Sequence, residues 1–229
     1  VAEFSTLDGK TNVGVILTGG VSDAAAAYAS TTGTATSGRT AIAAQDGDAA
    51  LTVTDAATVA QANSVATATT GTVQFSGGIT DITTNLMNGD SSAISTGLST
   101  AKTDDSDVVI TANTAVTVAQ FNLLDAATSS AIVLSGGISD TAANLAPSGT
   151  ASSGLTNSTT QDADVAITIT GTAPTVTELN KIASLTTGVV TASISGNKTT
   201  LAGLTTASTD AVTATVTDAV TVAEFNTLD

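Results

Sequence analysis

The chain has 229 residues, enough for one or two ordinary domains, but aromatic residues make up only 2% and Trp is absent, which argues against a thick globular core. A mean hydropathy of +0.33 with 11% charged residues favours a folded chain over a disordered one. The net charge of −15 opposes binding to nucleic acid or to anionic lipid, and the lack of Cys and His removes thiolate chemistry and the commonest general base.

In chain order, the first 58 residues predict two modules, each with one strand and one short helix. The stretch that begins VAEF predicts a helix, and a strand over 12–18 follows it. TGGVSD (18–23) predicts a Gly-Gly bend and then a helix that starts at the Ser-Asp pair. A Ser/Thr/Gly-rich stretch (30–45) leads to an acidic pair and to a strand over 51–56, whose side chains alternate in direction.

These features recur along the whole chain. The motif V-A-[EQ]-x-[NS] begins at Val1, Val59, Val118 and Val222, with a diverged copy at Val176, so the spacings are 58, 59, 58 and 46 residues. Further strands are expected over 72–76, 108–113, 131–135, 165–170, 189–194 and 212–217. The Gly-Gly bend returns in SGGITD (76–81) and SGGISD (135–140), each with a helix start such as Ser139-Asp140, and degenerates to ASISGN (192–197).

Four helix starts carry a sharper signal. A threonine stands three residues before Gln or Glu at four positions: Thr58, Thr117, Thr175 and Thr221. This is the spacing of a capping box, in which the Thr hydroxyl accepts the backbone N–H of the Gln or Glu, whose side chain accepts the backbone N–H of the Thr. An apolar stripe follows each of them at intervals of three, as in Val118, Phe121 and Leu124. In the other module, apolar pairs such as Ile79 and Leu86 lie seven residues apart, which is two turns of one helix.

The periodicity predicts a β/α solenoid, in which short parallel strands alternate with short helices over one continuous domain, 1–229. Its repeat units are 1–58, 59–117, 118–175 and 176–221, and 222–229 begins the next unit. Strands stack at about 4.8 Å whereas helix axes need about 8–10 Å. The sheet must therefore curve, or the two kinds of helix must lie at different heights, or one unit must form a single large coil.

No residue pattern predicts a catalytic or cofactor-binding site, and we expect no enzyme activity. The best candidates for chemistry are acidic pairs at i and i+2, which could bind Ca²⁺ if neighbouring coils supplied further oxygen ligands. These candidate metal ligands are Asp46, Asp48, Asp105, Asp107, Asp162 and Asp164. The alternative is that aspartate is simply a good residue for turns and caps.

The sequences ISDTAANL (138–145), TVAQFNLLD (117–125) and DAVTATVTDAVTVAEF (210–225) resemble repeats of very large secreted bacterial proteins, frequent in cyanobacteria, which act as adhesins, surface coats or matrix filaments. The segment 121–125 also looks like repeats of phage tail fibres.

The resemblance implies a structural protein, extracellular or at the cell surface, that forms a filament, sheath or adhesin stalk and whose partner is itself. The alternative is a surface module that binds glycan, calcium or a host receptor. No stretch approaches 18 apolar residues, so no membrane span is expected.

Overall fold

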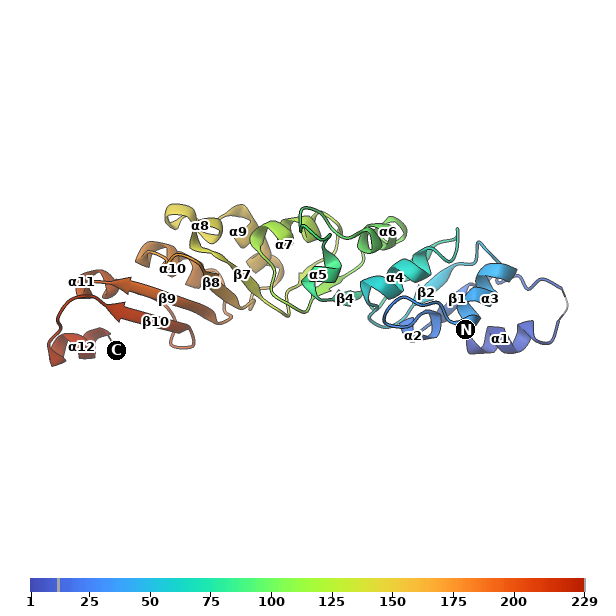
Figure 1. Ribbon diagram of the computed structural model, residues 1–229, viewed down its shortest axis with the longest axis horizontal. Helices are drawn as coiled ribbons and strands as arrows, with labels where there is room; N and C mark the ends of the chain where they lie inside the picture. The colour runs from blue at the N-terminus through green and yellow to red at the C-terminus, as the bar shows by residue number, and fades with distance from the viewer. Residues whose placement is uncertain (12, 229) are drawn as a thin grey trace. The chain divides into compact units, whose positions relative to one another are not determined.

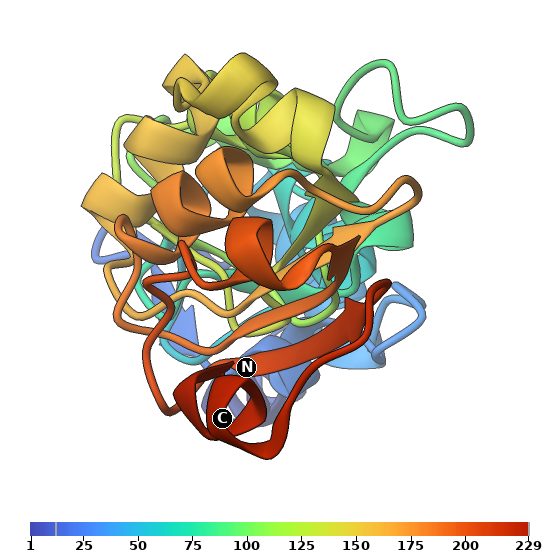
Figure 2. The ribbon, with the colours of Figure 1, turned by 90° about the vertical axis from the view of Figure 1, so that its left-hand side faces the viewer.

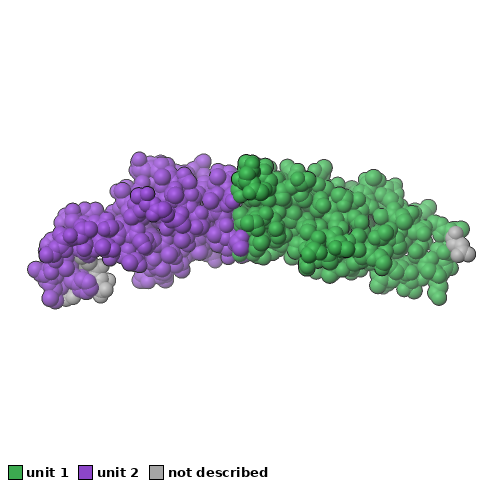
Figure 3. All heavy atoms as spheres, in the orientation of Figure 1, with its two compact units in different colours: residues 1–113, 123–133 green, residues 114–122, 134–229 purple. Residues whose placement is uncertain are grey.

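The computed structural model describes residues 1–11 and 13–228, and the chain folds into two compact units (Figure 3). Unit 1 comprises residues 1–113 and 123–133, and unit 2 comprises residues 114–122 and 134–229. The fold is α/β, with three parallel sheets of three or four strands and short helices between the strands (Figure 1).

Unit 1 contains two three-stranded sheets. The first has the order β1 (Val21–Asp23), β2 (Leu51–Val53), β3 (Val73–Phe75), and the second has the order β4 (Ile79–Asp81), β5 (Ile110–Ala112), β6 (Ile132–Val133). Its helices are α1 (Ala2–Asp8), α2 (Ala25–Tyr28), α3 (Ser37–Gln45), α4 (Val59–Ala66), α5 (Thr83–Leu86) and α6 (Thr96–Asp104).

Unit 2 contains the four-stranded sheet β10-β9-β8-β7, in which the red β10 lies beside the orange β9 (Figure 2). The strands are β7 (Ile138–Thr141), β8 (Ile167–Thr170), β9 (Val190–Gly196) and β10 (Ala211–Val216). Its helices are α8 (Ala142–Leu145), the 3-10 helix η1 (Pro147–Gly149), α9 (Ser153–Gln161), α10 (Val176–Ala183), α11 (Lys198–Leu201) and α12 (Val222–Leu228). Helix α7 (Val118–Asp125) contains one of the three points at which the chain passes between the two units.

The strand predictions are confirmed in most modules and wrong at two kinds of position. Residues 13–18 form no strand, and residue 12 lies outside the described residues. Ser139 and Asp140, predicted to start a helix, belong to strand β7, and α8 begins only at Ala142. The same correction applies to 21–23 and 79–81, because the Asp is the last residue of a strand. The prediction that the seven-residue apolar pairs lie two turns apart on one helix is therefore wrong, because one member lies on a strand and the other on a helix. The pairs Ile79 with Leu86 and Ile138 with Leu145 are nevertheless buried.

Gly-Gly turns explain why the strands form three sheets. Gly78 has φ +76, and a Cβ on Gly77 would lie 2.1 Å from the carbonyl carbon of Asp55, so the turn needs both a left-handed residue and a close backbone approach. The strand before this turn pairs back with β2, and the strand after it pairs forward with β5. In the fourth repeat, ASISGN lacks the Gly-Gly pair and β9 runs unbroken over 190–196, paired with both β8 and β10.

The Ser/Thr/Gly-rich stretches contain the nine-residue helices α3, α6 and α9, which the sequence pattern did not predict. Thr36, Ser95 and Ser152 cap these helices by accepting a backbone N–H with their side chains. Leu98 of α6 and Leu155 of α9 are fully buried. Burial and capping therefore outweigh the poor helix propensity of the other residues.

Candidate functional site

The four predicted capping boxes are confirmed. Thr58 Oγ1 accepts the N–H of Gln61 while Gln61 Oε1 accepts the N–H of Thr58, at 3.2 and 3.0 Å. The same reciprocal pairs form at Thr117 with Gln120, at Thr175 with Glu178, and at Thr221 with Glu224. These boxes fix the first turn of α4, α7, α10 and α12.

The first residue of such a helix is held by an aspartate 22 residues later. The N–H of Val59 donates to Asp81 Oδ2 and that of Val118 donates to Asp140 Oδ2, both at 3.0 Å. Both carboxylates are buried, and their Oδ1 atoms accept the next backbone N–H and an Asn side-chain amide at 2.7–2.9 Å. The aspartate thus lies at or next to the end of its own strand and fixes the helix of the preceding module.

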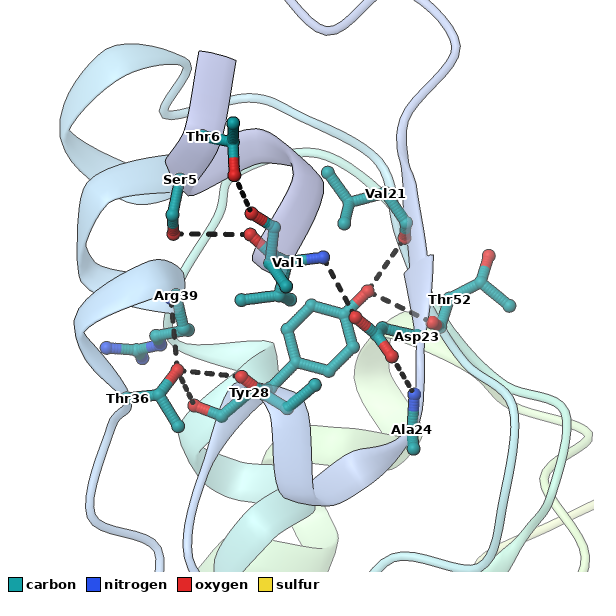
Figure 4. Close-up of polar contacts among 12 residues, drawn as sticks. Val1, Ser5, Thr6, Val21, Asp23, Ala24, Tyr28, Thr36, Arg39 and Thr52 are labelled. Atoms are coloured by element: carbon teal, nitrogen blue, oxygen red, sulfur yellow. Dashed lines mark hydrogen bonds and ion pairs between the residues drawn. The ribbon is translucent and has the colours of Figure 1, made fainter. Parts of the chain in front are cut away.

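The first module repeats this geometry with the amino group of Val1, which donates to Asp23 Oδ2 at 2.8 Å, again 22 residues away (Figure 4). This contact, together with the N–H of Ala24, holds the pKa of Asp23 below its ordinary value. Beside it, the Tyr28 hydroxyl donates to the carbonyls of Val21 and Thr52, which lie on the neighbouring strands β1 and β2. Burial raises the pKa of this phenol.

Among the predicted metal ligands, Asp105 interacts with Asp107 and Asp162 with Asp164, and the first member of all three pairs has a structural partner. Asp46, Asp105 and Asp162 directly follow α3, α6 and α9. Their Oδ2 atoms accept the backbone N–H groups of Leu17, Phe75 and Leu134 at 2.5, 2.6 and 2.7 Å. The lone acid of the shortened repeat, Asp210, accepts the N–H of Val190 at 2.9 Å in the same way.

The second members, Asp48, Asp107 and Asp164, are exposed. Burial, followed by the neighbouring carboxylates of Asp107 and Asp164, raises the pKa values of Asp105 and Asp162. Two carboxylates facing each other could share a cation, but no group of three or more acidic, His or Cys side chains suited to a metal occurs in the described part of the chain. A Ca²⁺ ion at these pairs stays a prediction, and it would need backbone or water oxygens to complete 6–8 ligands.

Sequence reasoning missed two further acceptors. Asp55 Oδ1 accepts the N–H of Ala25 at 2.6 Å, and Asp218 Oδ1 accepts that of Lys198 at 2.8 Å. The available signal was that Asp ends the strand patterns TVTD (52–55) and TVTD (215–218). Recurrent aspartates in this chain therefore bind backbone amides of modules that lie 20–30 residues away.

A polar groove lies in unit 1. It has a cavity of about 510 Å³ whose lining comes from α4, α5 and the segments before and after them, and includes Thr31, Thr32, Thr58, Asn63, Asn85 and Met87. Hydroxyl and amide groups beside apolar side chains are the groups that hold sugars or other neutral polar ligands, so this groove is a candidate binding surface.

No protein-family model, curated protein or solved structure matches the chain. Within residues 1–11 and 13–228, no helix is long and apolar enough to cross a membrane. Function must accordingly be argued from the geometry of this chain.

Proposed function

We propose that the protein is structural: a β/α solenoid, extracellular or at a cell surface, that extends by self-association into a filament, sheath or adhesin stalk. The observation that carries the proposal is the contact between the first valine of a helix and an aspartate 22 residues later, made three times at the same offset. An interaction repeated at fixed spacing joins each of these three helices to the strand that follows, and such nearest-neighbour contacts are the organisation of repeat proteins.

Two properties of the surface support this proposal. The charge of −15 keeps such a chain soluble while it assembles. Apolar side chains are exposed on both units: Leu7, Val13 and Ile16 in unit 1, and Val222 and Phe225 in unit 2. Exposed apolar surface of this kind favours association between copies.

The test is sedimentation velocity of the 229-residue chain from about 1 to 100 μM, a range that spans common affinities between protein surfaces, followed by negative-stain electron microscopy. We expect the sedimentation coefficient to rise with concentration and thin filaments of constant width to appear. A monomer throughout the range would sink the proposal that the chain self-associates.

The polar groove of unit 1 supports a second candidate, a surface module that binds glycan. Its hydroxyl- and amide-bearing lining is compatible with a neutral sugar, whereas the net charge disfavours acidic ones. A glycan array with wild-type protein and with Asn63→Ala would test this idea, since Asn63 lines the groove and binding that depends on it would support the candidate. Binding to no glycan would remove this candidate.

A further inference from the structure

The loop that links α5 to α6 contains the only Asn-Gly pair of the sequence, Asn88-Gly89 (Figure 1). Residues 89–93 are all exposed, and a Cβ on Gly89 would meet nothing within 4 Å. Water therefore reaches this pair, and no neighbouring side chain shields it.

The equivalent loops of the first and third repeats lie against the chain of a later helix. A Cβ on Gly33 would lie 2.8 Å from the carbonyl oxygen of Ala60 in α4, and one on Gly149 would lie 2.5 Å from Thr177 Cγ2 in α10. Gly89 makes no such contact, so the loop of the second repeat is the most accessible of the three at its glycine.

The side-chain amide of Asn88 is polarised by its own loop. Its Oδ1 accepts the N–H of Ala93 at 3.1 Å, and its Nδ2 donates to Ser92 Oγ at 3.2 Å. The Ser92 hydroxyl donates in turn to Asp90 Oδ1 at 2.7 Å, and this contact, followed by the N–H of Ser92, holds the pKa of Asp90 below its ordinary value. A donor on Oδ1 draws electrons from Asn88 Cγ and also faces the negative oxygen that forms when a nucleophile adds to that carbon.

The backbone nitrogen of Gly89 is the nucleophile nearest to this carbon along the chain. Its attack closes a five-membered ring, and such intramolecular reactions have a high effective concentration. Within residues 1–11 and 13–228, the N–H of Gly89 donates to no acceptor, and glycine allows the backbone rotation that the attack needs. By contrast, Asn63-Ser64 and Asn157-Ser158 lie inside α4 and α9, where helical hydrogen bonds fix the backbone.

We propose that Asn88 deamidates spontaneously in the folded protein, so that this loop is a self-modification site. The Gly89 nitrogen bonds to Asn88 Cγ and loses its proton to water, while the Cγ–Nδ2 bond breaks and the leaving nitrogen takes up a proton and departs as ammonia. Water then opens the resulting succinimide at either carbonyl, which leaves aspartate or isoaspartate at position 88. Water is the one co-reactant, and nothing is oxidised or reduced. The reaction occurs within one chain and does not depend on the proposed self-association.

Either product loosens the loop. The backbone N–H of Asn88 donates to the carbonyl of Ala93 and its carbonyl accepts the N–H of Ser91, both at 2.9 Å, and these bonds hold Ser91 in the left-handed region at φ +57. Aspartate removes the donor to Ser92 and adds a charge beside Asp90. Isoaspartate lengthens the main chain by one methylene group and displaces both backbone bonds.

The test is to incubate the wild-type chain at neutral pH and to map deamidation by mass spectrometry. The tryptic peptide 40–102 contains both Asn63 and Asn88, so its fragmentation compares the two residues in one sample. Digestion in heavy-oxygen water marks any deamidation that occurs during the digest. We expect Asn88 to react at least about tenfold faster than Asn63, whose backbone is held in a helix, with isoaspartate detected by enzymatic methylation. Equal rates at the two residues would overturn the proposal.

The same chain in concentrated urea shows how the sequence reacts without the folded loop. The native rate at Asn88 should match or exceed the rate in urea, because the N–H of Ala93 is placed on Oδ1 only in the folded loop. A native rate below the rate in urea would mean that the fold protects Asn88, which contradicts the proposal.

Gly89→Ala is the matched variant. The added methyl has open space, so the fold is kept, but it restricts the backbone and shields the attacking nitrogen. Deamidation at Asn88 should fall at least about tenfold. Hydrogen exchange over residues 86–95 should speed up as the wild type ages and stay constant in the variant. Deamidation at the same rate in both proteins would refute the assignment of Gly89, and deamidation without faster exchange would refute the loosening of the loop.

Discussion

Replacing Asp81 by Asn measures how strongly the valine–aspartate contact holds successive modules. The carboxylate is buried and accepts three donors, the N–H groups of Val59 and Ile82 and the Asn85 side-chain amide, at 3.0, 2.9 and 2.8 Å. The amide has the same shape, but one of its two oxygens becomes an NH₂ group. In either orientation at least one buried donor faces another donor.

An unpaired buried donor costs about 1–3 kcal/mol, and hydrogen bonds to a charged acceptor are each worth about 1.5–3 kcal/mol. We therefore expect Asp81→Asn to lower the free energy of unfolding by about 2–3 kcal/mol. For a chain of this length, this corresponds to a fall in melting temperature of about 4–12 °C. Asp140→Asn should behave alike, because Asp140 accepts the same three kinds of donor.

The assay is urea unfolding followed by circular dichroism at pH 7 in calcium-free buffer. Asp48→Asn is the control, because it removes the same charge from an exposed carboxylate of unit 1. The reasoning is refuted if Asp81→Asn changes the midpoint by no more than Asp48→Asn does, because the loss would then reflect net charge alone.

Three further outcomes are expected. Gly77→Ala should lower the free energy of unfolding by at least about 3 kcal/mol, because its Cβ would overlap the backbone of Asp55. Gly89→Ala, with open space around the glycine, should match the wild type. Equal urea midpoints for the two variants would contradict the role of the turn. Because the pKa of Asp105 is raised in the folded state, its contribution to stability is present below the unfolded value of 3.8 and is lost as pH rises through the folded pKa. Asp105→Asn should therefore gain stability relative to the wild type between pH 4 and pH 7. A difference in unfolding free energy that does not change with pH would argue against this reasoning. Calcium should raise the melting temperature and EDTA should reverse that rise, with a smaller effect in Asp107→Asn, which alters one of the three acidic pairs. No response in the wild type would rule out calcium binding at these pairs.

Sequence patterns succeeded where the deciding residues are neighbours in the chain. The Thr58 box is complete within four residues, so its geometry follows from local spacing. The alternation of side chains predicted for the strand over 51–56 is likewise confirmed, since Leu51 and Val53 are buried and Thr52 between them is half-buried. The Gly-Gly motif was recognised as a bend, but its role in separating β3 from β4 depends on the backbone of Asp55, which follows β2 and lies more than twenty residues earlier.

What the sequence determined by itself is the period, the helix starts and the alternation of the strands, because each depends on contacts within about one turn or one strand. Tertiary structure alone decided that the Ser/Thr/Gly stretches are helical, since their weak propensity is overcome by burial of Leu98 and Leu155. Tertiary structure also decided which backbone N–H each aspartate accepts. A carboxylate in a turn can accept a local N–H, bind a metal or accept a distant N–H equally well. Only the packing of modules 20–30 residues apart selects among these partners.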